Sequence, residues 1–252
     1  MLHVERHGTG RDLVLLHGWG LHGRVWAPLA EQVRSRYRLH VVDLPGHGLS
    51  RDEPFGTLDE IVDRLADALP AGAIVCGWSL GALLAMRLAR RHERLVGALV
   101  LVGATPCFVE RCDWPHAMKP STLESFAQGF RTDPARTIRS FIALNAHGGP
   151  ESRARTRELA ALVAERETPS PQALEAALVL LRETDLRPEV PGISRPATVI
   201  HGGRDVLAPA QAGRWIARSL PGARLVEIGD AAHFPFASHA ACVAQAIGAV
   251  HG

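Results

Sequence analysis

The chain has 252 residues, of which 46% are hydrophobic and 21% are charged. This length and composition are typical of a soluble globular protein, either one α/β domain with an insertion or two small domains. The formal net charge of +2 is too balanced to indicate a nucleic-acid-binding protein.

Cysteine spacing and hydropathy narrow the class of protein further. The four cysteines form no Cys-x-x-Cys pair, so their spacing indicates neither a zinc site nor a redox motif. No apolar run is long enough to cross a bilayer. The first residues, Met1–Arg6, lack the apolar core of a signal peptide. We therefore expect a cytoplasmic protein that partners neither a membrane nor nucleic acid.

Short apolar runs alternate with helical patterns in the first part of the chain, which is typical of a parallel sheet with crossover helices. The expected strands are 13–16, 39–43, 73–76 and 95–102, with helices at 25–35 and 58–69. Continuous apolar character predicts that 95–102 is buried on both faces. Strands resume at 197–200 and 224–228, each followed by a helical pattern.

The alternation stops between residues 107 and 190, where helical patterns continue without a convincing strand. Ser170-Pro171 has the residues of a helix N-cap and first helical position. Leucines then recur at helical spacing, at 174, 178 and 181. We expect one α/β core made of residues 1–106 and 191–252, interrupted by a helical lid at 107–190.

The segment Gly77-Trp78-Ser79-Leu80-Gly81 lies between an expected strand and an expected helix. This is the context in which G-x-S-x-G forms a nucleophile elbow. Glycine is needed beside the serine, because a Cβ there would meet neighbouring backbone. Without further partners the same pentapeptide is equally compatible with a flexible turn.

A serine nucleophile needs a base and an acid. His233 follows the last expected strand, and Asp205 follows the strand before it. Loops at the carboxyl ends of parallel strands gather at one edge of the sheet. The order Ser79, Asp205, His233 is the one typical of this arrangement. Asp43 and Asp230 are the alternative acids, and Asp205 has the alternative role of capping the next helix.

An oxyanion hole requires two preorganised N–H donors. We expect one from Leu80, the residue after the nucleophile, and one from Trp19, in the loop His17-Gly18-Trp19-Gly20 after an early strand. His17 is interpreted as a structural residue that holds this loop.

Five motifs in this order resemble the α/β-hydrolase superfamily over the whole chain. They are 17–20, 43–50, 77–81, 201–205 and 229–233. The resemblance implies an α/β-hydrolase fold, with a mostly parallel central sheet flanked by helices and an inserted helical lid. A haloalkane dehalogenase is disfavoured, because its elbow carries a carboxylate where Ser79 stands.

Within the superfamily, the chain resembles the carboxylesterases that act on the methyl ester of pimeloyl-[acyl-carrier protein] in biotin synthesis. The elbow and the segments 104–108, 113–115, 119–120 and 141–145 carry this resemblance. It implies a substrate-binding set that includes residues of the lid. That set comprises Trp19, Ser79, Leu80, Phe141, Leu144, Asn145 and His233. The family has glutamine where Asn145 stands.

The resemblance also implies that the lid docks an acidic acyl carrier protein. Arginines cluster on both sides of the segment 141–145, and Arg136, Arg153 and Arg157 match the family's docking positions. Arginine suits carboxylates and phosphate. The alternative is a solvated helix face paired locally with Glu151 and Glu158.

The expected reaction is a two-step ester hydrolysis by a monomer. Ser79 attacks the carbonyl, His233 moves the protons, and no metal or organic cofactor is needed. Two other functions remain open from the sequence. One is a small-ester carboxylesterase or lactonase without a carrier partner. The other is a ligand receptor on a hydrolase scaffold.

Overall fold

The computed structural model describes residues 1–148 and 151–250, so residues 149–150 of the expected lid and 251–252 lie outside the described residues. In this part of the chain, seven strands form one sheet in the order β1-β3-β2-β4-β5-β6-β7. They are β1 (Val4–His7), β2 (Arg11–Leu16), β3 (Tyr37–Val42), β4 (Ala73–Trp78), β5 (Val96–Val102), β6 (Ala197–Gly202) and β7 (Arg224–Ile228). All neighbours pair in parallel except β1 and β3.

The predicted strands are all present, whereas the edge strand β1 is absent from the sequence prediction. Its residues, Val4–His7, are half-buried or exposed and mostly polar, so they carry no apolar signal. Antiparallel pairing with β3 nevertheless forms this strand. The prediction for 95–102 is confirmed over most of its length, since β5 is buried at every position but one.

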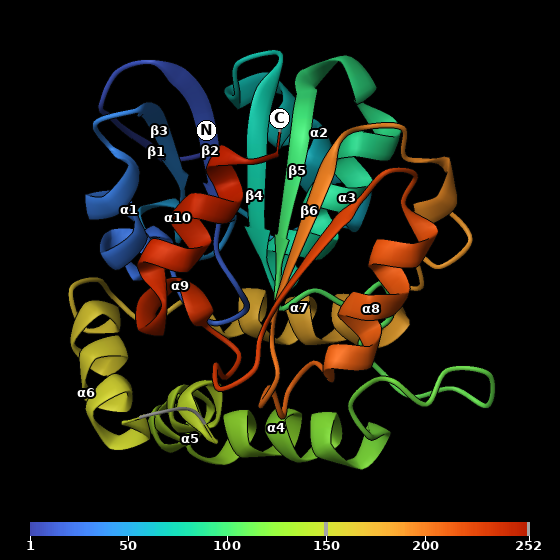
Figure 1. Cartoon of the computed structure of the whole chain (residues 1–252). Helices are drawn as coiled ribbons and strands as arrows, with labels where there is room; N and C mark the ends of the chain where they lie inside the picture. The colour runs from blue at the N-terminus through green and yellow to red at the C-terminus, as the bar shows by residue number, and fades with distance from the viewer. Residues whose placement is uncertain (149–150, 251–252) are drawn as a thin grey trace.

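Helices cover both faces of the sheet (Figure 1). They are α1 (Ala27–Val33), α2 (Leu58–Ala68), α3 (Leu80–Arg91), α8 (Ala210–Ser219), α9 (Pro235–Ser238) and α10 (Ala240–Gly248). In Figure 1, α1, α9 and α10 lie in front of the sheet, and α2 and α3 lie behind it. The helix expected at 25–35 begins instead as a 3₁₀ turn at Gly23–Trp26, and α1 then starts beside Pro28.

Four more helices follow β5 and lie beyond the carboxyl ends of the strands (Figure 1). They are α4 (Pro120–Thr132), α5 (Pro134–Ala146), α6 (Ser152–Val163) and α7 (Pro171–Glu183). The Ser170 hydroxyl accepts from the Ala173 N–H and caps α7, as predicted. These helices therefore cover the edge of the sheet at which the loop residues of a parallel sheet converge.

Candidate active site

Ser79 lies in the turn between β4 and α3, with φ 56° and ψ −115°. This backbone conformation is strained for a residue with a side chain, at a cost of about 1–3 kcal/mol. A Cβ on Gly77 would lie 2.2 Å from the Gly81 carbonyl oxygen, and one on Gly81 would lie 2.2 Å from that of Leu16. Only glycine fits at either position, so the turn matches the predicted elbow.

Asp205 and His233 are joined directly, with 2.7 Å between the Asp205 Oδ2 and the His233 Nδ1. The other carboxylate oxygen accepts from the N–H groups of Leu207 and Ala208, at 2.9 and 2.8 Å. Asp205 therefore holds its own turn with one oxygen and the imidazole with the other. The helix that follows, α8, is not capped by Asp205, because its N-cap is Pro209.

The Asp205 carboxylate is charged in this environment. Burial by itself would raise its pKa, but the charge and hydrogen bond of His233, together with the nearby His201, lower the pKa below its usual value. A charged carboxylate on Nδ1 keeps the proton of His233 on that nitrogen. The Nε2 lone pair is then available as a base.

The backbone of His233 is held from two sides. The Trp78 indole N–H donates to the His233 carbonyl oxygen at 2.8 Å. The His233 backbone N–H donates to the Asn145 carbonyl oxygen at 3.1 Å. Trp78 belongs to the elbow strand and Asn145 to α5, so the imidazole is positioned by both the sheet and the helical insertion.

Ser79 and His233 line one enclosed pocket, where they are 6% and 1% exposed. In the described residues, no hydrogen bond joins the Ser79 hydroxyl to the imidazole. Such contacts are often long in unliganded enzymes. The rest of the wall is apolar and comprises Trp19, Phe108, Met118, Leu123, Phe126, Phe141, Leu178, Leu181 and Leu207.

Two backbone N–H groups, one in the residue after Ser79 and one in a residue that lines the same pocket as Ser79, lack an acceptor within the described residues. They belong to Leu80, the first residue of α3, and to Trp19, in the loop after β2. The Trp19 side chain is fixed by a bond from its indole nitrogen to the Leu174 carbonyl oxygen, 3.1 Å. The donors expected for an oxyanion hole are thus unoccupied, and one of them adds the positive end of a helix dipole.

His17 lies under this loop. Its Nε2 accepts from the Leu44 N–H at 2.9 Å, and its Nδ1 donates to the Gly18 carbonyl oxygen at 2.8 Å. Burial and the neighbouring His47 hold the pKa of His17 well below its usual value. The imidazole is therefore neutral and bonded on both nitrogens, as expected for a structural residue.

Neither alternative acid contacts His233. Asp43 is buried and accepts from the N–H groups of Gly23 and Leu49, at 2.7 and 2.8 Å, and it pairs with Arg166. Asp230 is 56% exposed at its side chain and pairs with His239 at 3.2 Å. Asp43 therefore organises loops beside the site, and Asp230 lies at the surface.

Because His47 is buried, we expect the protein to lose stability in mild acid. Burial lowers its pKa to about 4, whereas an unfolded histidine has a pKa of about 6.5. Between these values the unfolded state binds the extra proton, so stability falls as the pH is lowered. From pH 7 to pH 5 this residue should cost about 2 kcal/mol of unfolding free energy.

Urea denaturation of His47→Asn at both pH values measures this cost. The asparagine amide can keep the bond to the Pro45 carbonyl oxygen, 2.8 Å in the native protein, but does not titrate. The variant should lose about 2 kcal/mol less than the native protein. The exposed His7→Asn is the control. Equal losses in native protein and His47→Asn would contradict the prediction.

The three expected lid residues lie in different surroundings. Phe141 lines the enclosed pocket. Leu144 instead lines a surface groove between α4 and α5. Asn145 is fully buried, and its side-chain amide donates to the Phe141 carbonyl oxygen at 2.7 Å, while its Oδ1 has no partner in the described residues.

The three expected docking arginines are exposed on the insertion, Arg136 on α5 and Arg153 and Arg157 on α6. Glu151 and Glu158 pair with Arg155 instead. Within the described residues, no acidic side chain pairs with any of the three. The local pairing considered from the sequence is therefore present for Arg155, but not for the three expected docking arginines.

The sequence prediction missed several contributors to the site, among them Phe126 and Arg166. Phe126 lines the enclosed pocket, and its spacing from Leu123 and Phe130 on α4 is a helical signal that could have found it. Arg166 pairs with Asp43 and, at 3.1 Å, with Glu5. No local pattern could reveal that contact, because it joins residues more than 100 positions apart.

In the part of the chain that the structure describes, no group of three or more His, Cys, Asp or Glu side chains could hold a metal ion. None of the described helices has the length and apolar character to cross a membrane.

Comparison with known proteins agrees with this architecture. The α/β hydrolase fold family model matches residues 13–240. The pimeloyl-[acyl-carrier protein] methyl ester esterase of Nitrosomonas europaea is 43% identical over 237 residues, 94% of each chain. The protein of that name from Chromobacterium violaceum is 44% identical over 238 residues, 94% of this chain and 93% of the relative.

Solved structures share the fold at lower identity. An esterase from Exiguobacterium antarcticum superposes with a TM-score of 0.89 at 22% identity, covering 100% of this chain and 96% of that chain. A bromoperoxidase from Bacillus anthracis superposes with a TM-score of 0.90 at 23% identity, covering 99% and 95%. The matched family model and the full-length relatives establish that this chain belongs to the α/β hydrolase fold family.

Proposed function

We propose that this protein is a serine carboxylesterase that hydrolyses the methyl ester of pimeloyl-[acyl-carrier protein] to the free acid and methanol in biotin synthesis. The main observation in support is that His233, which is bonded to Asp205, lines the same apolar pocket as Ser79. Relatives of this name that match nearly the whole chain support the choice of substrate.

In the proposed mechanism, His233 Nε2 takes the Ser79 proton as the hydroxyl oxygen attacks the ester carbonyl carbon. The N–H groups of Leu80 and Trp19 stabilise the oxyanion. The imidazolium, stabilised by Asp205, then protonates the departing methoxide, and methanol leaves. Water attacks the acyl carbon as it gives a proton to His233. When the second oxyanion collapses, His233 returns that proton to the Ser79 oxygen, which releases the free acid and restores the Ser79 hydroxyl.

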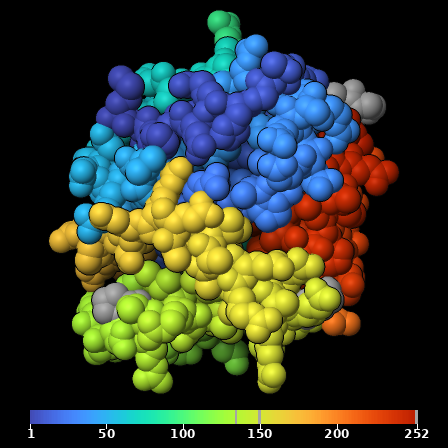
Figure 2. Space-filling view, turned by 90° about the vertical axis from the view of Figure 1, so that its left-hand side faces the viewer, coloured from blue at the N-terminus to red at the C-terminus, as the bar shows by residue number. Residues whose placement is uncertain are grey.

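The insertion, residues 107–190, serves as the lid over this site. The end of α6 and the residues after it are tied to the core by a hydrogen bond between His22 Nε2 and the Val163 carbonyl oxygen, 3.0 Å, and by the Arg24–Glu165 ion pair, 2.6 Å. Figure 2 shows this yellow segment against the blue N-terminal part of the chain. One side of the lid is therefore anchored while α4 and α5 cover Ser79.

Substrate docking is assigned to Arg136, Arg153 and Arg157. The three side chains are exposed on α5 and α6, and no acidic side chain within the described residues neutralises them. Exposed guanidinium groups bind carboxylates and phosphate in bidentate geometry. The proposed partner is therefore an acidic carrier protein, with the enzyme acting as a cytoplasmic monomer.

Hydrolysis of the carrier-bound methyl ester, compared with free dimethyl pimelate, tests this function. A higher kcat/KM on the carrier-bound ester is expected.

The cellular test is complementation of a biotin-requiring strain that lacks this esterase, with Ser79→Ala as control. The kinetic comparison also separates the alternatives. Equal kcat/KM on both esters would favour a small-ester carboxylesterase or lactonase. A single slow turnover would favour a ligand receptor.

Reversing the charge at the three docking positions is expected to weaken recognition of the carrier. The Arg136→Glu/Arg153→Glu/Arg157→Glu variant should lose about 10²-fold in kcat/KM on the carrier-bound ester, mostly through KM, because steering and ion pairing are removed. The kcat/KM for p-nitrophenyl acetate should fall by less than about twofold, because this small ester does not use the docking surface.

The control for this prediction is Arg94→Glu. Arg94 is exposed and lies just before β5, at the edge of the sheet opposite to Ser79. It should leave both activities unchanged. Equal losses on both esters in the triple variant would contradict docking by these arginines.

A further inference from the structure

The pocket that holds Ser79 is too small for its proposed substrate as it stands. Its cavity volume is about 30 Å³, against about 500 Å³ for the groove between α4 and α5. An acyl chain of several carbons therefore enters only when a side chain of the wall moves.

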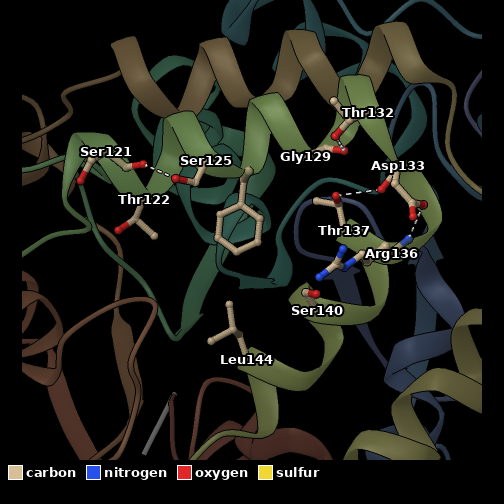
Figure 3. A pocket seen from close by; sticks show the side chains of 11 residues that line it. Ser121, Thr122, Ser125, Gly129, Thr132, Asp133, Arg136, Thr137, Ser140 and Leu144 are labelled. Carbon is tan, nitrogen blue, oxygen red and sulfur yellow. Dashed lines mark hydrogen bonds between the residues drawn. The ribbon is translucent and has the colours of Figure 1, made fainter.

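A much larger cavity lies on the outer side of the same wall. It is a groove of about 500 Å³ between α4 and α5. Figure 3 shows Ser121 and Ser125 of α4 on one side and Ser140 and Leu144 of α5 on the other. Hydroxyl groups, Asp133 and Arg136 provide the polar part of this lining, and side chains such as Phe126 and Leu144 provide the apolar part.

Phe126 lines both the groove and the enclosed pocket. It is only partly buried, whereas its neighbours on the pocket side, Trp19 and Phe141, are 3% and 9% exposed. Its ring meets theirs edge to face, at centroid distances of 6.5 and 6.0 Å. Phe126 is thus the partition between the two cavities, and the groove provides space into which its ring can swing.

We propose that ester substrates reach Ser79 from the α4–α5 groove past Phe126, and that Phe126 sets the width of acyl chain admitted. The polar side chains along the groove then bind the hydrophilic part of the substrate that follows the acyl chain. This inference rests on the proposed hydrolysis at Ser79 and adds the route and the selecting residue.

A second route between α4 and α7 is less favourable. The cavity there is about 110 Å³. The side chains that separate it from the Ser79 pocket, Leu123 and Leu178, are 8% and 6% exposed. The Arg131–Glu175 ion pair, 2.8 Å, also crosses from α4 to α7 on this side. Opening this route would break that pair and expose two leucines.

Tryptophan substitutions that fill one cavity at a time distinguish the routes. Ser140→Trp fills the α4–α5 groove, Val179→Trp fills the α4–α7 cavity, and Gln128→Trp adds the same bulk to an exposed position of α4. The measurement is kcat/KM for p-nitrophenyl octanoate divided by kcat/KM for p-nitrophenyl acetate. The longer acyl chain must occupy the route, whereas the acetyl group ends within the pocket.

Ser140→Trp should lower this ratio about tenfold or more, and Gln128→Trp and Val179→Trp should leave it within about twofold. A fall with Val179→Trp and none with Ser140→Trp would overturn the proposed route. Equal ratios in all three variants would overturn it too.

The selecting role of Phe126 has its own comparison. Phe126→Ala should raise kcat/KM for a p-nitrophenyl ester ending in a cyclohexyl ring, relative to the octanoate, about tenfold. Phe130→Ala removes the same atoms from α4 and also unpacks the Trp19 ring, which lies 5.1 Å away. An equal change in both variants would show that loosened packing, rather than width selection, is responsible.

These assays separate the inference from the proposed function. The p-nitrophenyl esters need no carrier, so the ratios are measured whether or not the carrier-bound ester is the physiological substrate. If the native protein fails on the carrier-bound ester while Ser140→Trp still lowers the ratio, the function is wrong and the route stands.

Binding of octanoate to Ser79→Ala, measured by calorimetry, reports the same route without turnover. There Ser140→Trp should weaken binding and Gln128→Trp should not.

Discussion

Replacing Ser79 with alanine is expected to lower kcat for ester hydrolysis by about 10⁵-fold, because the covalent route through the acyl-enzyme is lost. The strained backbone at this position is retained with either side chain, so the protein should stay folded. Burst and steady-state release of p-nitrophenol measure the change.

Ser194→Ala is the matched control for Ser79→Ala. Its hydroxyl donates to Glu93 at 2.6 Å just before β6, at the sheet edge remote from the elbow. It should keep full activity. If Ser79→Ala retained turnover of a short ester within about tenfold of the native rate, Ser79 would not be the nucleophile.

Asp205→Asn is expected to lower kcat by about 10⁴-fold with little loss of stability. The amide oxygen can keep the bonds from the Leu207 and Ala208 N–H groups that the carboxylate accepts in the native protein. The amide nitrogen then faces His233 Nδ1, and two donors cannot share one hydrogen bond. The imidazole must place its proton on Nε2, where it no longer serves as a base.

Proton NMR of the imidazole and the pH dependence of kcat/KM test this explanation. The downfield proton of the His233–Asp205 bond should vanish in Asp205→Asn, and thermal unfolding should stay close to that of the native protein. Asp230→Asn, at an exposed carboxylate paired with His239, is the control. Activity in Asp205→Asn within about tenfold of the native rate would place the acid elsewhere.

Much of the fold was predictable because its signals are local. The buried strands β2 to β6 carry runs of apolar residues, and the capped start of α7 at Ser170 is a side-chain-to-backbone bond within one turn. The glycines around Ser79 are likewise dictated by backbone contacts, although their partners include Leu16, from another strand. Strand β1 was missed because its only stabilising signal is its partner β3.

Side-chain contacts between distant segments were not predictable in the same way. Asp43 was recognised as a turn residue, but its pairing with Arg166 joins the core to the insertion. Leu144 was expected to line the substrate path, and the structure places it in the α4–α5 groove rather than in the pocket around Ser79. Phe141 lies about one helical turn before Leu144 on the same side of α5, so helical spacing alone does not tell which of the two lines that pocket.

The sequence by itself determined the α/β core, the elbow at Ser79 and the order of Ser79, Asp205 and His233. Each of these can be recognised from the type of residue and from its position directly after an apolar run that forms a strand. Only the tertiary structure decided which acidic side chain is bonded to His233 and which side chains line the pocket. Those contacts depend on how β6, the loop after β7 and the inserted helices pack together. Close packing of distant segments fixes distances to within an ångström, and no spacing along a chain carries that information.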